Sequence, residues 1–320
     1  MSKALTASLF AALAACAGPA LAVSIDWASV GNPNNPADDT TSRGSVATAY
    51  RIDKYEVTNQ QYVDFLNAVD PSGANTLGLF NTSMNIPSYI AISLDSLAGA
   101  GHKYSVAAGR QNQPVTYVTL YDTFRFANWL NNGQGSSSTE TGAYNLSGGT
   151  PIPSNFSSIV RSPTAHVFIP NINEWYKAAY YNPQTNSYFE YPTASNTAPN
   201  ASGPTAAPNS ANYDGVVPGT FVDVGSYPLT PSPYGTFDQG GNAWEFNETI
   251  LTLGSGLYGG YGGGDASWMS TSAYQIPLSA STWDFAIGFR VASLIPEPSS
   301  FILAALSVIG LVAWGRRRRR

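Results

Sequence analysis

Few side chains in this sequence of 320 residues belong to the types that catalyse reactions or bind transition metals. The one cysteine, Cys16, and the two histidines, His102 and His166, are far apart in the chain. A single thiol excludes an intrachain disulfide framework and a metal site built from several cysteines. The histidines lack the spacing of metal-binding motifs, and no G-x-S-x-G segment marks a hydrolase nucleophile. We therefore expect neither a cysteine- or histidine-rich metal centre nor a serine hydrolase.

The overall composition indicates a folded, loop-rich protein of low charge. Charged residues make up 11% of the chain, against about 25% in an average globular protein. The hydrophobic fraction of 43% supports a sizeable core, and 30 glycines with 22 prolines indicate many turns. The formal net charge of −5 makes nucleic acid an unsuitable partner, because phosphate binding requires a basic surface. The 19 tyrosines and seven tryptophans are compatible with an extracellular or sugar-handling surface.

Residues 1–22 have the pattern of a secretory signal peptide. Lys3 precedes an apolar run over residues 4–17, and Ala20 and Ala22 fit the small-x-small rule for cleavage after Ala22. Because Cys16 lies in this segment, lipoprotein processing is an alternative, and a buried N-terminal helix is another. The first interpretation predicts an exported protein.

The C-terminus carries three ordered elements. Pro296, Glu297 and Pro298 precede an apolar stretch over residues 299–315, and five arginines follow at 316–320. The stretch is at the short end for a transmembrane segment, and the arginines would hold its end in the cytoplasm. This order over residues 293–320 resembles the PEP-CTERM sorting signal of Gram-negative bacteria. The resemblance implies an exosortase as partner, membrane contact before processing, and a final place in the cell envelope or extracellular matrix. A simple tail anchor is the alternative.

The central part of the chain contains three helix signals. The first two combine an N-cap residue with apolar side chains at helical spacing. The third combines an N-cap residue with Glu174 at the third helical position, which is a capping-box arrangement. The predicted helices span residues 59–69, 120–131 and 171–180, with Thr58, Thr119 and Asn171 as their caps.

Short strands and long loops fill the rest of the chain. Strands are predicted over residues 50–57 and 114–118, with weaker signals at 89–92 and 103–106, and as a series of short segments from Phe221 onwards. Loops are predicted over residues 31–45, 133–149 and 182–212, where Gly, Pro, Asn and Ser accumulate. We therefore expect an irregular α+β domain over residues 50–292, preceded by an irregular lead-in at 23–49.

Six short motifs follow one another in this domain, at residues 56–59, 113–115, 174–175, 241–246, 259–260 and 287–292. Each motif is weak alone, but their order resembles the formylglycine-generating enzyme family, also called the sulfatase-modifying factor family. The resemblance implies a loop-rich α+β fold, related to C-type lectins, with short helices and short strands.

The resemblance also shows which catalytic groups are missing. The enzymatic branch of the family oxidises a substrate cysteine with copper held by two cysteines that follow a Gly-Gly motif, and copper suits thiolates. Here Tyr261 follows Gly259 and Gly260, and no cysteine occurs up to Met269 or elsewhere in residues 23–295. A second branch uses iron held by several histidines, which this chain also lacks. We therefore expect neither copper nor iron, and a module without catalysis. An oxidoreductase with altered chemistry is the alternative.

Calcium sites held by oxygen atoms are also part of the family fold, and the resemblance places them on residues of this chain. In a first site Asp238 and Glu245 would supply side-chain oxygens, and Gln239, Gly241 and Ala243 backbone oxygens. A second site would use Asn212, the Tyr213 carbonyl and Asp214. The alternative for Asn242 and Glu245 is turn capping and a buried hydrogen bond. Arg290 is expected to pair with a buried carboxylate.

Aromatic residues gather where the family binds its substrate: Tyr258, Tyr261, Trp268, Tyr274 and Trp283. Aromatic rings can stack on the faces of sugars, although core packing is the alternative, which we favour for Trp268 and Trp283. Residues 23–295 hold nine basic and nineteen acidic side chains, a net charge of −10. The sequence thus predicts an exported, non-catalytic module that binds an extracellular polysaccharide or protein.

Overall fold

The computed structural model describes residues 22–86, 89–217, 221–251, 254–273 and 276–295. The predicted signal peptide, apart from Ala22, lies outside these ranges. Pro296, Glu297, Pro298 and the predicted transmembrane stretch at 299–315 also lie outside them. Among the described residues, no helix is both long and apolar enough to cross a membrane.

The three predicted helices are present at the expected positions. Helix α1 spans Asn59–Val69, α2 spans Leu120–Asn131 and α3 spans Ile172–Tyr180. Each begins with a complete capping box, in which the cap side chain accepts a hydrogen bond from the third backbone N–H and the third side chain bonds back to the cap. These reciprocal bonds satisfy N–H groups that the first helical turn leaves without partners, so the helix starts are encoded locally.

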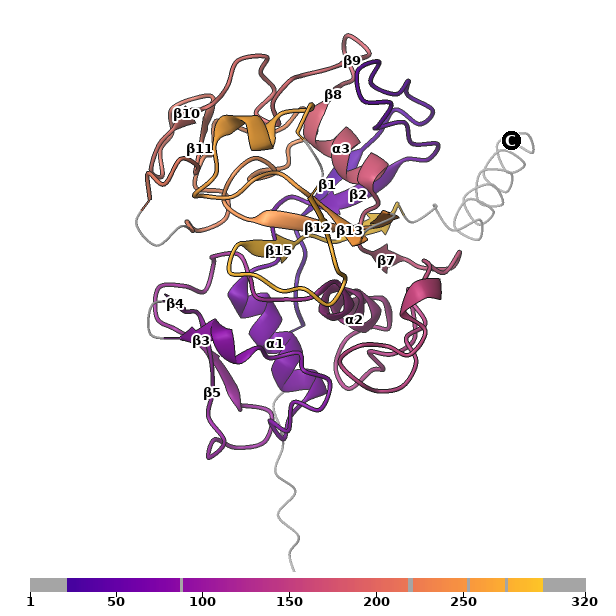
Figure 1. Cartoon of the computed structure of the whole chain (residues 1–320), viewed down its shortest axis with the longest axis vertical. Helices are drawn as coiled ribbons and strands as arrows, with labels where there is room; N and C mark the ends of the chain where they lie inside the picture. The colour runs from indigo at the N-terminus through magenta and orange to yellow at the C-terminus, as the bar shows by residue number, and fades with distance from the viewer. Residues whose placement is uncertain (1–21, 87–88, 218–220, 252–253, 274–275, 296–320) are drawn as a thin grey trace, which may run out of the picture.

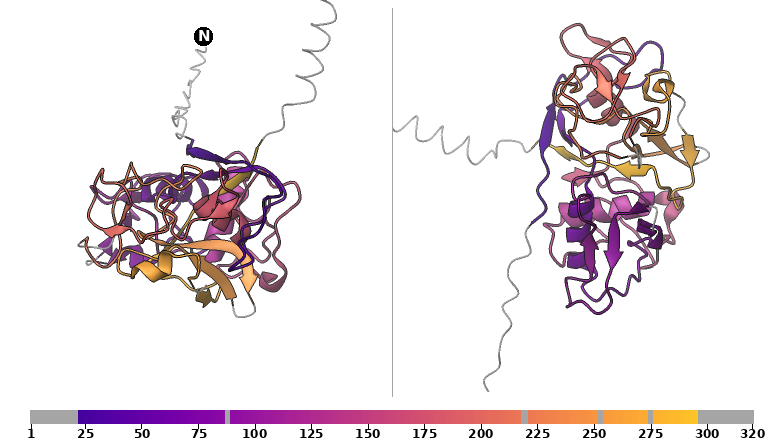
Figure 2. Two further views of the ribbon diagram at one scale, coloured as in Figure 1. Left: turned by 90° about the horizontal axis from the view of Figure 1, so that it is seen from above. Right: turned by 90° about the vertical axis from the view of Figure 1, so that its left-hand side faces the viewer.

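The first sheet joins the two ends of the described chain. Its order is β1 (Trp27–Val30), β2 (Tyr50–Asp53), β16 (Ala292–Leu294) and β7 (Val167–Phe168), with antiparallel pairing throughout. Figure 2 shows β1, in indigo, close to β16, in yellow, at one edge of the molecule. Strand β1 corrects the prediction of an irregular lead-in, because its pairing with β2 is a long-range contact that local pattern does not reveal. The strand predicted over 50–57 ends at Asp53.

The second sheet has the order β14 (Ile276–Leu278), β13 (Gly254–Tyr258), β12 (Trp244–Leu251) and β15 (Ile287–Phe289). Strands β12 and β15 run parallel, and the other pairs are antiparallel. The predicted β series therefore begins at Trp244 rather than Phe221, since residues 221–243 form turns. The strand predicted over 114–118 is also wrong: this stretch makes one bridge, Thr58 to Pro114, and Tyr117 has a φ of 60°.

The remaining regular structure consists of very short elements. The two-stranded pairs are β3 (Asn85–Ile86) with β4 (Tyr89–Ile90), β5 (Ile92–Leu94) with β6 (Tyr104–Val106), β8 (Tyr181–Asn182) with β9 (Ser187–Tyr188), and β10 (Asn200–Ala201) with β11 (Ser210–Ala211). Single 3₁₀ turns occur at η1 (Thr82–Met84), η2 (Phe156–Ser158) and η3 (Ala266–Met269). The weak strand signals near 89–92 and 103–106 are confirmed, and the whole is the predicted loop-rich α+β fold.

Aromatic side chains build the core on both sides of the second sheet. Strands β12, β13 and β15 run between α1 and α2 on one side and the loops around β10 and β11 on the other (Figure 1). Towards α1 and α2, Phe126 packs edge-on to Phe65 and Phe289, with ring centroids 5.3 and 5.4 Å apart. A second cluster joins Trp175 of α3 to Tyr258 of β13, with ring centroids 5.2 Å apart. The loops between these elements are thereby fixed against a packed interior.

Candidate functional site

The segments that carry the predicted calcium ligands converge in the structure. The N–H of Asn242 donates to the Asn212 carbonyl (2.9 Å), and that of Gly241 donates to the Gly259 carbonyl (2.8 Å). Gly241 has a φ of +83°, and a Cβ there would lie 2.3 Å from the Asn212 oxygen. Only glycine fits this close approach. The two stretches named for calcium, 212–214 and 238–245, are therefore neighbours.

The Glu245 carboxylate is fully engaged by protein donors. Arg290 Nε lies 2.6 Å from Oε2 and Nη2 lies 2.7 Å from Oε1, while Trp175 Nε1 donates to Oε2 at 2.7 Å. Glu245 and Arg290 are both fully buried. The predicted pairing of Arg290 with a buried carboxylate is confirmed. A guanidinium this close repels a divalent cation, so Glu245 does not fit as a calcium ligand.

Other carboxyl groups near Arg290 share this buried environment. Burial raises the pKa of Asp238 to about 6 and that of Asp53 to about 7, although Arg290 opposes both shifts. Burial also raises the pKa of Glu56 well above its usual value, and Glu56 accepts hydrogen bonds from Asn242 Nδ2 (3.1 Å) and the Ala243 N–H (3.2 Å). At mildly acidic pH the carboxyl groups of Asp53, Asp238 and Glu56 are therefore largely protonated, and the Arg290 guanidinium is the cation among them.

Asn242 connects the converging segments and takes the capping role considered for it. Its Oδ1 accepts from Asn212 Nδ2 (3.2 Å) and the Val222 N–H (3.0 Å). Asp238 Oδ2 accepts from the Gly225 N–H at 2.6 Å, and Asp214 lies at the exposed surface. Within the described ranges, no group of three or more His, Cys, Asp or Glu side chains is placed to hold a metal ion. Calcium binding stays a prediction.

An aromatic pocket of about 250 Å³ lies beside these segments, over residues of β12, β13 and β15. It is lined by Trp244, Leu257, Tyr261, Trp268, Thr282, Asp284, Phe285, Ala286 and Ile287. The ring of Tyr261 stacks on that of Trp268 (5.8 Å, 25°) and meets that of Phe285 edge-on (5.7 Å, 84°). Trp268 is 38% exposed and Phe285 39%. The pocket thus offers ordered aromatic faces to solvent.

Local geometry fixes the orientation of Trp268. Asp265 caps the turn η3 by accepting the Ser267 N–H at 2.8 Å. A Cβ on Gly264 would lie 2.4 Å from the Trp268 ring, so the absence of a side chain there lets the indole lie against the backbone. Trp268 also packs on Trp244 of β12, with ring centroids 5.5 Å apart. The platform is therefore preorganised.

The structure separates the aromatic residues that the sequence grouped together. Tyr258 is 1% exposed, packs on Trp175 and accepts a hydrogen bond from Arg43, so a surface ligand cannot reach it. Conversely, Trp268 and Trp283, for which core packing was favoured, are 38% and 46% exposed. Tyr274 lies outside the described residues. Trp244 and Phe285 were missed, because only sheet pairing and loop packing bring them beside Tyr261.

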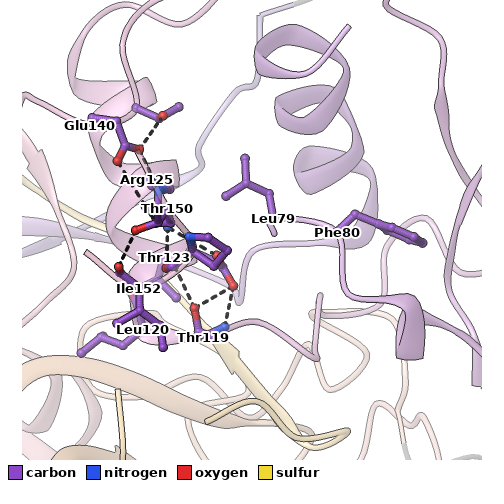
Figure 3. Close-up of polar contacts among 12 residues, drawn as sticks. Leu79, Phe80, Thr119, Leu120, Thr123, Arg125, Glu140, Thr150 and Ile152 are labelled. Carbon is purple, nitrogen blue, oxygen red and sulfur yellow. Dashed lines mark hydrogen bonds and ion pairs between the residues drawn. The ribbon is translucent and has the colours of Figure 1, made fainter. Parts of the chain in front are cut away.

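A second pocket, of about 210 Å³, lies nearby and is lined by Gly78, Asn81, Thr119, Tyr121, Asp122, Pro151, Ile152, Ser281 and Trp283. The buried Arg125 organises its wall: Nε lies 2.7 Å from Glu140 Oε1, and Nη2 donates to the Thr150 carbonyl at 2.7 Å (Figure 3). Nη1 donates to the Pro151 carbonyl at 3.1 Å. Helix α2 thereby holds the loop that carries Pro151 and Ile152.

Comparison with known proteins agrees with this architecture. Residues 27–294 match the family described as sulfatase-modifying factor enzyme 1-like domain, and residues 294–320 match the PEP-CTERM protein-sorting motif. Treponema denticola variable protein 1 is 18% identical in sequence, with a TM-score of 0.55, over 85% of this chain and 96% of that one. The crystal structure of CarF gives 18% identity and a TM-score of 0.56, over 85% and 99%. No match was found among curated proteins.

The two matched regions account for nearly all of the described chain and continue directly into one another at residue 294. The sorting motif indicates processing by an exosortase and export to the cell envelope or extracellular surface of a Gram-negative bacterium. The chain belongs to the family of sulfatase-modifying factor enzyme 1-like domains and carries a C-terminal PEP-CTERM sorting motif.

Proposed function

We propose that residues 23–295 form an exported, non-catalytic module that binds an extracellular polysaccharide at the aromatic pocket. The observation that carries the proposal is the surface platform of Tyr261, Trp268 and Phe285, with Thr282 and Asp284 at its edge. Aromatic faces bury the apolar C–H faces of sugar rings, and the hydroxyl and carboxylate at the edge supply hydrogen bonds. No hydrogen bond to Tyr261 Oη or Trp268 Nε1 occurs within the described part of the chain, which leaves both donors for a ligand.

The missing catalytic ligands support a binding role over the family's oxidation chemistry. Copper binding in the family requires thiolates, which are the soft ligands that copper prefers. Residues 23–295 contain no cysteine, and Tyr261, the residue after Gly259 and Gly260, is part of the aromatic platform instead. The segment after Gly259 and Gly260, where the family carries its active-site cysteines, therefore contributes to an aromatic surface in this chain.

The test is a glycan array probed with residues 23–295, followed by calorimetric titration of the glycan retained. We expect Trp268→Ala to weaken binding by about tenfold or more, because a stacking platform is worth at least ~1.4 kcal/mol. Because Trp268 also packs on Trp244 and Tyr261, the substitution should lower the melting temperature, and melting curves check that the variant is folded at the temperature of the titration. Phe156→Ala is the matched control, because Phe156 is an aromatic residue 58% exposed in η2 and lies in neither pocket.

Three results would contradict the proposal. Retention of no glycan on the array would exclude polysaccharide binding, and retention of peptides alone would assign a protein ligand instead. Equal losses of glycan affinity for Trp268→Ala and Phe156→Ala would show that the glycan does not bind at the aromatic pocket. Conversion of a cysteine peptide to an aldehyde, with copper added, would favour the alternative of an oxidoreductase with altered chemistry.

A further inference from the structure

Residues 279–285 separate the aromatic pocket from the second pocket and contribute side chains to both. Thr282 and Asp284 line the aromatic pocket, whereas Ser281 and Trp283 line the second. The stretch begins with a turn, in which the Thr282 N–H donates to the Ser279 carbonyl at 2.8 Å, and its side chains divide between the two pockets, so it forms a wall that both share. We call residues 279–285 the dividing loop.

The dividing loop is fixed to the start of α2 and the chain before it. The Leu120 N–H donates to the Ala280 carbonyl at 3.1 Å, and the Tyr117 N–H donates to the Asp284 carbonyl at 3.0 Å. The rings of Tyr117 and Trp283 pack with centroids 5.9 Å apart. The two rings are tilted by 52°, and because Tyr117 is 7% exposed and Trp283 is 46% exposed, a buried ring packs against an indole that is partly open to solvent. Trp283 is therefore a second aromatic platform.

The second pocket combines this platform with polar groups held by α2. Asp122 is 4% exposed and lines the pocket, and its Oδ2 accepts from the Thr119 N–H and hydroxyl, both at 2.8 Å. Its Oδ1 lies 4.0 Å from Arg125 Nη1, beyond hydrogen-bond distance. Each pocket thus has an aromatic face, a hydroxyl side chain and one carboxylate, namely Asp284 in the first and Asp122 in the second.

Charge restricts what can occupy both pockets. A carboxylate in each pocket, on a domain of net charge −10, repels a polymer of uronic acids or sulfated sugars. Neutral sugars present hydroxyl groups, which donate hydrogen bonds to carboxylates, and C–H faces, which pack on aromatic rings. The charge pattern therefore favours an uncharged polysaccharide.

We propose that the second pocket is a further binding site for sugar residues, so that an uncharged polysaccharide crosses the dividing loop and occupies both pockets. This inference rests on the function proposed above and names its ligand class and a second site. Two linked sites convert the second contact into an intramolecular one, so affinity should rise with oligomer length once both pockets are reached.

The experiment uses residues 23–295 and four immobilised polymers: chitin, β-glucan and mannan as uncharged probes, and alginate as the uronic acid probe. The uncharged polymer that is retained is then cut into disaccharides and hexasaccharides, and the affinity of each is measured by titration. We expect the hexasaccharide to bind about tenfold or more tightly than the disaccharide. Trp283→Ala should abolish this gain with length and leave disaccharide affinity within about twofold, a difference below ~0.4 kcal/mol.

A second variant blocks the second pocket without removing Trp283, in case Trp283→Ala disturbs the dividing loop. Ser281→Glu adds bulk and charge to the second pocket and retains the contact between Trp283 and Tyr117. It should also abolish the length gain, whereas Trp268→Ala should weaken both oligomers and Phe156→Ala neither. Melting curves establish that each variant is folded.

The outcomes separate this inference from the proposed function. If an uncharged polymer binds but both second-pocket variants retain the length gain, the second site is wrong and the function stands. Retention of alginate alone overturns the ligand class. If no polymer is retained, the proposed function itself fails.

Discussion

At the scale of single residues, the carboxyl groups around Arg290 are the least usual feature. Glu245 holds the Arg290 guanidinium through both of its oxygens, and this pair occupies the place for which calcium was considered. Burial raises the pKa of Asp53 to about 7 and that of Asp238 to about 6. Breaking a buried charge pair leaves an uncompensated charge, so Glu245 and Arg290 depend on each other.

The raised pKa of Asp53 predicts that stability falls as pH rises. Between pH about 4 and about 7 the folded protein keeps a proton on this carboxyl that the unfolded chain has lost. The free energy of unfolding therefore decreases over this range, by at most ~1.4 kcal/mol per pH unit for each such group. Urea unfolding from pH 5 to pH 8 measures this slope, and Asp53→Asn should flatten it and make the protein more stable than the wild type at pH 8.

Asp26→Asn is the control for that experiment. Asp26 forms an ion pair with Lys54 at 3.1 Å, and its side chain is 60% exposed. Exposed pairs contribute little, so this variant should lose less than about 1 kcal/mol. The Asp26 charge is the smallest of the causes that act on the pKa of Asp53, so the variant should reduce the pH dependence much less than Asp53→Asn does. A wild-type stability that rises between pH 5 and pH 8 would show that these carboxyls are ionised in the folded protein.

At the scale of elements, turns rather than helices decide how the site is assembled. Gly241 joins the turn before β12 to residues 212 and 259, because its N–H donates to Gly259 and its Cα faces the Asn212 carbonyl. The three helices begin at caps within their own sequence, whereas these turns are held by hydrogen bonds between segments far apart in the chain. Substitutions at the turns should therefore have the larger effect on the site.

Gly241→Ala tests this expectation against a matched glycine. Gly241 has a φ of +83° and a Cβ there would lie 2.3 Å from a backbone oxygen, whereas Gly235 has a φ of +82° with nothing within 4 Å. Both substitutions carry the cost of a left-handed backbone, about 1–2 kcal/mol, but only Gly241→Ala adds a backbone clash. We expect a loss of about 3 kcal/mol or more for Gly241→Ala in urea unfolding. Equal losses at the two positions would show that the close approach costs nothing.

At the scale of the whole molecule, the first sheet ties the start of the domain to its end. Strands β1, β2 and β16 are adjacent, so removing the sorting motif after residue 295 leaves this sheet complete. The fold then presents the aromatic pocket and the second pocket on either side of the dividing loop. Removal of the sorting motif therefore does not interrupt the strands on which the domain is built.

Calcium binding is a prediction for the whole domain, because its predicted donors come from separate segments. With Glu245 held by Arg290, the remaining donors are Asp238, the backbone oxygens of its segment, and residues 212–214. An ion that binds only the folded state raises the melting temperature, so calcium should give a higher value than a chelator does. Asp214→Asn should reduce this difference, whereas Asp223→Asn, at another exposed acid, should not. Equal melting temperatures at millimolar calcium would contradict the prediction.

Local sequence patterns determined the elements whose stabilising contacts lie within a few residues. The caps Thr58, Thr119 and Asn171 predicted the helix starts, because capping bonds span only three residues. The same reasoning missed β1 and placed a strand at 114–118, because strand pairing joins residues far apart in the chain. The sorting motif was readable because its three elements are consecutive.

The candidate site was only partly predictable, because burial and direction decide what a side chain can contact. The sequence named Tyr261 and Trp268 for the right region, together with Tyr258, which the fold buries against Trp175. The sequence predicted that Arg290 pairs with a buried carboxylate, but it assigned Glu245 to a calcium site and did not reveal that these two residues are partners. Composition and order determined the family, the export signal and the absent thiols, which are properties of single residues and short segments. The pockets and their shared dividing loop were decided by the tertiary structure alone, because long-range backbone pairing sets which side chains face solvent together.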